Sequence, residues 1–255
     1  LSLHSKEHLD LIIEKSTHLE QSNLDADTIV NRDSLPAALY GIGSVKQAID
    51  LVIGGEAKNA FCATRPPGHH AERNKAMGFC IFGNVAIGAK YALSHKSISK
   101  VAILDFDVHH GNGTQNLIWN EKNILFISSH QMPLFPGSGY SDETGAFNNI
   151  LNVPLTSGSD GSHYLKVMDE TILPKIENFS PDIILLSAGF DAHKDDPLAQ
   201  FQLESKDFYE ITKRTLELSK SHCNGKVVSI LEGGYDLNAL KESTSMHVNA
   251  MLEFN

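Results

Sequence analysis

The alternation of short apolar runs with longer amphipathic stretches constrains the fold of this chain most strongly. Six runs rich in β-branched and other apolar residues are predicted as strands: Asn59–Ala63, Val101–Phe106, Ile124–Ser128, Ile150–Val153, Ile183–Ser187 and Lys226–Leu231. Longer stretches are predicted as helices: His4–Glu20, Gly43–Ile53, Ile81–Ser94, Ser162–Asn178, Ser205–Lys220 and Asn238–Leu252. This alternation is typical of a mostly parallel sheet with helices on both faces. The sequence therefore predicts an α/β fold, and 255 residues favour a single domain over residues 1–255.

Polar residues gather directly after the predicted strands. They occupy positions 65–70, 107–113, 129–139, 188–196 and 232–236. In open parallel sheets, ligands bind beyond the carboxyl ends of the strands, where these segments would meet. Residues 131–147 are rich in Gly, Pro and Ser and are predicted to form a long loop, a type of segment that often carries function.

The strand predicted at Val101–Phe106 leads into a candidate metal site. Asp105, Asp107 and His109 occupy every second position, so an extended chain would direct their side chains to one side. A carboxylate and an imidazole two residues apart can bind one divalent cation, and zinc accepts such nitrogen and oxygen ligands. Asp191, after another predicted strand, is the candidate third ligand, which would leave a position open for water or substrate. The alternative is that these side chains cap helices or turns.

Two adjacent histidines are candidates for acid–base chemistry. His69 and His70 follow a turn that two prolines and a glycine stiffen. Adjacent imidazoles can act as general base and general acid when neighbouring groups set their tautomers. Asp105 and Asn112 are the candidate orienting partners. Surface exposure or weak metal binding is the alternative for an isolated pair of histidines.

Three aromatic residues lie beside glycine or proline. Tyr235 follows a Gly-Gly pair, where its phenol could donate a hydrogen bond to a developing oxyanion. A rim aromatic that packs on the core is an equally good interpretation. Phe79 and Phe135 could wall a narrow channel for an alkyl chain, and burial in the core is the alternative.

Composition excludes several classes of protein. The formal net charge is −10, which argues against nonspecific nucleic-acid binding and is compatible with cationic substrates. The three cysteines form no CxxC pair, which favours reduced thiols over disulfides or a thiolate metal site. No apolar run approaches the ~20 residues of a membrane span. The first residues lack the pattern of a signal peptide, and the sequence therefore predicts a cytoplasmic protein without a membrane or nucleic-acid partner.

Taken together, these motifs resemble the histone deacetylase superfamily, which includes bacterial histone deacetylase-like amidohydrolases and acetylpolyamine amidohydrolases. The matching segments appear in the family's order: Arg65–Glu72, Gly78–Cys80, Asp105–Gly113, Phe135–Gly139, Ser187–Pro197 and Glu232–Leu237. Asn112, where other branches carry Asp, resembles class II deacetylases and their bacterial relatives. Family members usually have a further amino-terminal segment that shapes substrate choice and subunit contacts. This segment is expected to be missing before Leu1.

The resemblance implies an arginase-like, three-layer α/β/α fold around a mostly parallel sheet of about eight strands. It implies one catalytic Zn²⁺ on Asp107, His109 and Asp191. A structural K⁺ would lie near Asp105, Asp107, His109, Ser128 and Ser129. The acyl-lysine tunnel would be lined by Gly78, Phe79, Phe135, Leu198, Gly233 and Gly234.

The resemblance also implies the catalytic roles. His69 would pair with Asp105, and His70 with Asn112. His70 would be the main general base and acid, with His69 as an electrostatic helper. Tyr235 would polarise the acetyl carbonyl of an acetylated amine, either an acetyl-lysine peptide or an acetylpolyamine. A homo-oligomer is compatible with the family.

The residues alone leave two rival functions open. An arginase-type binuclear manganese ureohydrolase would need further carboxylates, but Gly111 follows His110 and position 193 is His. A non-catalytic module that binds acetylated amines is the second rival. The substrate is not determined, because the apolar Leu198 offers no carboxylate for a polyamine and only weakly favours a general deacylase.

Overall fold

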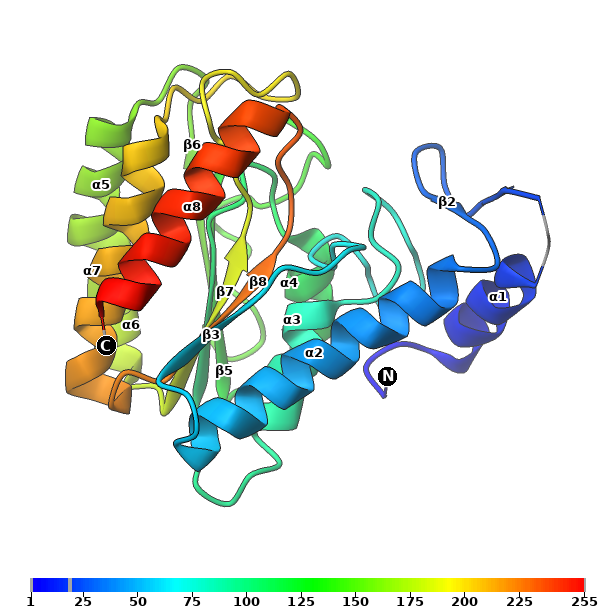
Figure 1. Ribbon diagram of the computed structural model, residues 1–255, viewed down its shortest axis with the longest axis horizontal. Helices are drawn as coiled ribbons and strands as arrows, with labels where there is room; N and C mark the ends of the chain where they lie inside the picture. The colour runs from blue at the N-terminus through cyan, green and yellow to red at the C-terminus, as the bar shows by residue number, and fades with distance from the viewer. Residues whose placement is uncertain (1, 18–19, 255) are drawn as a thin grey trace.

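A parallel sheet of six strands forms the centre of the computed structural model, which describes residues 2–17 and 20–254 (Figure 1). The strands, in chain order, are β3 (Asn59–Cys62), β4 (Val101–Asp105), β5 (Ile124–Gln131), β6 (Ile150–Leu155), β7 (Ile183–Ala188) and β8 (Val227–Leu231). Their order across the sheet is β3-β8-β7-β4-β5-β6. All six strands predicted from the sequence are therefore confirmed, with ends that differ by up to three residues.

The sheet has fewer strands than the expected eight. The two other strands of the described residues, β1 (Ser22–Asn23) and β2 (Ile29–Val30), pair only with each other in an antiparallel ladder. The six strands of the main sheet coincide with the six apolar runs. A strand covered on both faces needs such a run, and helices occupy most of the chain between these strands.

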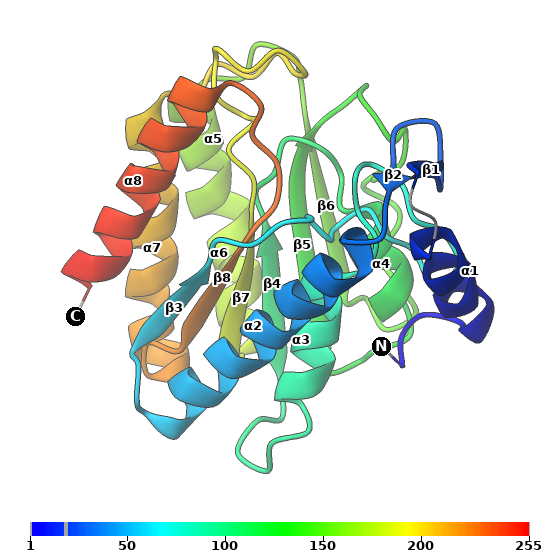
Figure 2. The ribbon, with the colours of Figure 1, turned by 45° about the vertical axis from the view of Figure 1, so that its right-hand side comes forward.

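Helices cover both faces of the sheet, which gives the predicted three layers (Figures 1 and 2). On one side lie α1 (Lys6–Ser16), α2 (Ser34–Gly54), α3 (Asn84–Ala92) and α4 (Asn112–Ile118). On the other lie α5 (Gly161–Val167), the π-helical turn η1 (Met168–Ile172), α6 (Leu173–Phe179), α7 (Ser205–Cys223) and α8 (Leu237–Glu253).

The alternation of side chains along each strand explains these two cores. In β4, Val101 and Ile103 pack into the core beneath α2 and α3, whereas Ala102 and Leu104 pack into the core beneath α7. Successive side chains of a strand point to opposite faces, so a strand covered on both faces must be apolar at every position. This requirement is why the sequence shows unbroken apolar runs.

The helices differ from the prediction at particular points. Helix α2 begins at Ser34, nine residues before the predicted start. The segment predicted as one helix over Ser162–Asn178 is α5, η1 and α6, with Pro174 in the first turn of α6. Proline lacks the amide hydrogen that a regular helix interior needs there.

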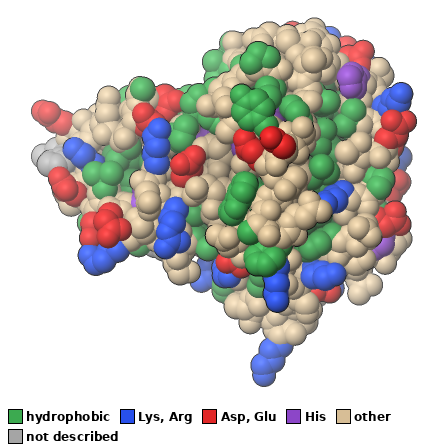
Figure 3. Space-filling view, turned by 180° about the vertical axis from the view of Figure 1, so that it is seen from behind, with side chains coloured by type: hydrophobic (Ala, Val, Ile, Leu, Met, Phe, Trp, Pro, Cys, Tyr) green, Lys and Arg blue, Asp and Glu red, His purple; other side chains and the backbone are tan. Residues whose placement is uncertain are grey.

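At the amino terminus, the predicted helix His4–Glu20 is α1 over Lys6–Ser16, and residues 18 and 19 of the prediction lie outside the described residues. Helix α4 was not predicted, because it has only seven residues and begins inside the polar motif at Asn112. No helix within the described ranges is long and apolar enough to span a membrane. On the face shown in Figure 3, lysine and arginine side chains are dispersed among acidic ones.

Candidate metal centre and active site

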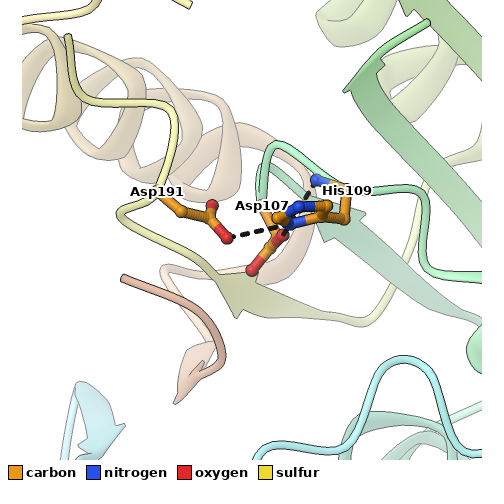
Figure 4. A group of neighbouring side chains, drawn as sticks. All are labelled: Asp107, His109 and Asp191. Carbon is orange, nitrogen blue, oxygen red and sulfur yellow. Dashed lines mark hydrogen bonds and ion pairs between the residues drawn. The ribbon is translucent and has the colours of Figure 1, made fainter. Parts of the chain in front are cut away.

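Three buried side chains meet at the carboxyl ends of two neighbouring strands. Asp107 and His109 follow β4, and Asp191 follows β7, which pairs with β4 in the sheet. One ligand atom of each residue lies within 4.8 Å of the others (Figure 4). His109 Nδ1 is 3.1 Å from Asp107 Oδ1 and 3.0 Å from Asp191 Oδ2. The three proposed zinc ligands therefore come together through strand pairing.

The backbone around these carboxylates is shaped to hold them. A Cβ atom on Gly189 would lie 2.2 Å from Asp107 Oδ2, and one on Gly233 would lie 2.3 Å from Asp191 Oδ2. The Gly233 amide donates a hydrogen bond to Asp107 at 2.9 Å. Only glycine permits such a close approach. Two fixed carboxylates and one imidazole are donors that could hold a divalent metal ion.

The electrostatics of the three side chains also favour a cation between them. Burial by itself would lower the pKa of His109, but hydrogen bonds with Asp107 and Asp191 raise it to about 10. Burial and the nearby charge of Asp107 raise the pKa of Asp191 to about 6. Burial opposes ionisation of Asp107 as well, but the charge of His69 and the hydrogen bond with His109 leave its pKa below the usual range. Carboxylates that stabilise a proton on Nδ1 would stabilise a metal ion in the same place.

The two predicted histidines lie beside this group, each with a separate partner. His69 Nδ1 is 3.0 Å from Asp105 Oδ2, and His70 Nδ1 is 2.8 Å from Asn112 Oδ1. Their ring centroids are 3.9 Å apart. Burial would lower the pKa of His69, but the charges of Asp107 and Asp105 raise it well above the usual value. Burial and the charge of His69 lower the pKa of His70. One imidazole therefore favours a proton and the other favours the neutral form.

Glu232 holds the turn that carries the two histidines, a role that the sequence analysis did not assign. Its Oε2 atom accepts hydrogen bonds from the amides of Gly68 and His69, at 2.7 and 3.1 Å. Its Oε1 atom accepts one from the Ser187 hydroxyl at 3.1 Å. The carboxyl is fully buried, and burial raises its pKa. The available signal was its position directly after a predicted strand, like that of Asp107.

A cavity of about 190 Å³ leads from the surface to these groups. Its lining includes the predicted tunnel residues Gly78, Phe79, Phe135 and Leu198, together with His70, His109, Leu134, Tyr235 and Asp27. Leu134 and Asp27 were not predicted from the sequence. The carboxylate of Asp27 accepts a hydrogen bond from the Gly78 amide at 3.1 Å, and the Thr28 hydroxyl accepts one from the Phe79 amide at 3.1 Å.

Two predicted tunnel residues are outside this lining. Gly233 lies behind the carboxylates of Asp107 and Asp191, as its close contacts show. Gly234 lies against the apolar core, where a Cβ atom would approach Leu240 to 2.8 Å. Both glycines leave room for neighbouring side chains, and their place in a substrate tunnel stays a prediction.

Tyr235 opens on the same cavity, with its ring centroid 5.8 Å from that of Phe79. Burial and the charges of Asp191 and Asp107 raise the pKa of the phenol, which therefore stays protonated as a hydrogen-bond donor. Asp196, to which the sequence analysis gave no role, accepts hydrogen bonds from the amides of Tyr235 and Leu198, at 2.7 and 3.0 Å. The Asp196 carboxylate thus holds the backbone of both Tyr235 and Leu198, two residues that line the cavity.

The residues proposed for potassium lie around the end of β4. The Asp105 carboxylate accepts a hydrogen bond from the Asp107 amide at 3.1 Å, and the Asp105 carbonyl accepts one from the Ser129 hydroxyl at 3.3 Å. Ser128 is the β5 partner of Asp105 in the sheet. The Ser128 hydroxyl lies 3.0 Å from His130 Nδ1.

Comparison with known proteins identifies the family. The model of the histone deacetylase domain matches residues 1–251. The chain is 42% identical to type-2 histone deacetylase 2 of Dictyostelium discoideum over 89% of this chain and 14% of that protein. It is 40% identical to a histone deacetylase-like amidohydrolase of Pseudomonas aeruginosa, over 84% of this chain and 57% of that protein. The crystal structure of the HDA15 HD domain superposes with a TM-score of 0.91 at 36% identity, over 98% of this chain and 73% of that one.

Proposed function

The chain belongs to the histone deacetylase family, and we propose that it is a zinc-dependent amidohydrolase that removes acetyl groups from acetyl-lysine or acetylated polyamine-type amines. One observation carries the proposal: His70, His109 and Tyr235 open on a single cavity, at the base of which His109 meets two buried carboxylates. A base, a candidate metal site and a phenol donor can together activate water and stabilise the oxyanion in the hydrolysis of an unactivated amide.

Each residue has a distinct task in this proposal. Zinc held by Asp107, His109 and Asp191 would supply a more acidic water and would polarise the amide carbonyl. His70, which burial keeps neutral, accepts the proton of the attacking water as the new carbon–oxygen bond forms. Tyr235 donates a hydrogen bond to the carbonyl oxygen as negative charge develops there. The proton then passes from His70 to the leaving nitrogen as the carbon–nitrogen bond breaks, which yields acetate and the free amine.

His69 supports this step through charge rather than proton transfer. Its imidazolium is stabilised by Asp105 and by the nearby Asp107 carboxylate. A fixed positive charge beside His70 keeps the latter neutral before reaction. We further propose that Asp105, Asp107, His109, Ser128 and Ser129, partly through backbone oxygens, would hold a structural K⁺ that would stiffen the turn carrying the metal ligands.

The shape and charge of the entrance support an acylated amine on an alkyl chain. Phe79, Phe135 and Leu134 are apolar walls suited to methylene groups. The carboxylate of Asp27 lies at the same cavity, and the net charge of −10 favours cationic substrates. Leu198 offers no carboxylate that would select a polyamine. We therefore favour a general lysine-type deacylase, acting on proteins or small amines.

The binuclear manganese alternative has little support from the site. Asp107, His109 and Asp191 are the single group with metal-ligand geometry found in the described part of the chain. His193, where a bridging carboxylate would be needed, accepts a hydrogen bond from the Asp195 amide at 3.2 Å. One metal ion per chain by elemental analysis would agree with the zinc proposal, and two would favour the manganese enzyme.

The test is kcat/KM of zinc-loaded protein for an acetyl-lysine peptide, acetylputrescine and acetylspermidine, with Asp191→Ala as the matched control. Acetate release by the parent and its loss in Asp191→Ala would support the proposal, and the ratio of the three substrates would name the class. Tight binding of the acetylated amines without acetate release would instead support a non-catalytic binding module.

A further inference from the structure

We propose that Glu72 is a positioning residue that sets the direction of the Asn112 amide and, through it, the tautomer of His70. Its effect on rate rests on the function proposed above, whereas its effect on the tautomer does not. Glu72 lies outside the cavity lining and is half-buried.

A chain of three side chains carries the inference. Asn112 Nδ2 donates a hydrogen bond to Glu72 Oε1 at 2.7 Å, and its second hydrogen can face Met77 Sδ, 3.4 Å away. On the opposite side, Asn112 Oδ1 lies 2.8 Å from His70 Nδ1. A side-chain amide can present either its oxygen or its nitrogen to a neighbour, so it does not choose a histidine tautomer by itself.

Glu72 makes this choice, because an ionised carboxylate only accepts hydrogen bonds. The NH₂ group of Asn112 must therefore face Glu72, and its oxygen must face His70. His70 Nδ1 then carries the hydrogen, and Nε2 keeps the lone pair that a general base needs. If the amide were reversed, two oxygens would meet at Glu72 and His70 would carry its hydrogen on the reacting nitrogen.

Hydrogen bonds of its backbone hold Glu72 in place. The Glu72 amide donates to the carbonyl of Lys75 at 2.9 Å. The Gly83 amide donates to His4 Nε2 at 3.0 Å, so the hydrogen of His4 is on Nδ1 and points to the Glu72 carbonyl, 3.0 Å away. The buried ring of His4 thus ties the amino-terminal segment to the residue that orients Asn112.

The backbone of Asn112 is also held in place, so only the orientation of its side-chain amide, oxygen or nitrogen toward His70, can vary. It is the first residue of α4, and the Thr114 amide donates to the carbonyl of His69 at 3.0 Å. A Cβ atom on Gly113 would lie 2.5 Å from the backbone of Ala71. Helix α4 therefore packs directly on the histidine segment, and the distance from Asn112 to His70 does not depend on Glu72.

This arrangement predicts a specific interaction between two substitutions. Glu72→Ala should lower kcat by about tenfold with little change in KM, in the range expected for groups that orient a reacting side chain. Glu72→Gln should cost no more than about threefold, since its amide oxygen can still accept from Asn112. Asn112→Asp should be strongly impaired, because two carboxylates would then face each other. Adding Glu72→Gln to Asn112→Asp should restore at least fivefold of kcat, because the introduced amide can donate to the introduced carboxylate.

The tautomer of His70 gives a readout that does not depend on turnover. In zinc-loaded protein labelled with ¹⁵N-histidine, the His70 signals are assigned by their loss in His70→Asn. The parent should show the Nδ1–H form, and Glu72→Ala should show a mixture. If Glu72→Ala keeps the Nδ1–H form and the parental kcat, or if the double variant is no better than Asn112→Asp, the proposal is overturned. A parent without activity on any acylated amine, but with the expected tautomers, would refute the proposed function and leave this inference standing.

Discussion

Replacing Glu232 by alanine should lower the melting temperature of the zinc-loaded protein by roughly 8–16 °C. The carboxylate accepts hydrogen bonds from the buried amides of Gly68 and His69 and from the Ser187 hydroxyl. The hydroxyl can rotate to another acceptor, but the two amides cannot. An unsatisfied buried donor costs about 1–3 kcal/mol, so the two together cost about 4 kcal/mol. For a chain of this size, about 1 kcal/mol shifts the melting temperature by roughly 2–4 °C.

Glu232→Gln is the matched control for this prediction. Its amide oxygen can accept from both backbone amides, and its NH₂ group can donate to Ser187. The substitution also removes a carboxyl whose ionisation is opposed by burial, as its raised pKa indicates. We expect its melting temperature to stay within about 4 °C of the parent. Equal melting temperatures for the parent and Glu232→Ala, measured by circular dichroism, would refute the reasoning that this carboxylate anchors the histidine turn.

Three further predictions test other parts of the molecule. Tyr235→Phe should lower kcat about 10²-fold, as for loss of an oxyanion donor, with an unchanged melting temperature; a parental kcat would remove Tyr235 from the mechanism. Gly233→Ala should prevent stoichiometric zinc binding, because its Cβ atom would lie 2.3 Å from Asp191 Oδ2, and one bound zinc per chain by elemental analysis would contradict this. Burial lowers the pKa of His247 to about 3, so the folded state binds fewer protons than the unfolded state as the pH falls below about 6.5. The parent should therefore lose about 2 kcal/mol more than His247→Gln between about pH 7 and about pH 5, and equal losses in both proteins would refute this assignment.

Features that depend on local pattern were predicted well. The six strands of the sheet were found because each contains a short run of apolar residues, which packs against the helices that cover the sheet. Asp107 and Asp191 were proposed as ligands of one metal from two separate motifs. The pairing of β4 with β7 places the two residues side by side. Helix α4 was missed because its seven residues begin with polar groups and show no extended amphipathic period.

The sequence by itself determined the α/β class, the strands and the polar residues at their ends, because hydrophobic periodicity and motif spacing are local properties of the chain. Only the tertiary structure decided which groups support the site. Glu232 contacts an amide 164 residues away, Asp196 reaches one 39 residues away, and Glu72 reaches Asn112 across 40 residues. Such contacts depend on strand order and on the packing of loops above the sheet, and the sequence near a carboxylate carries no record of its distant partner.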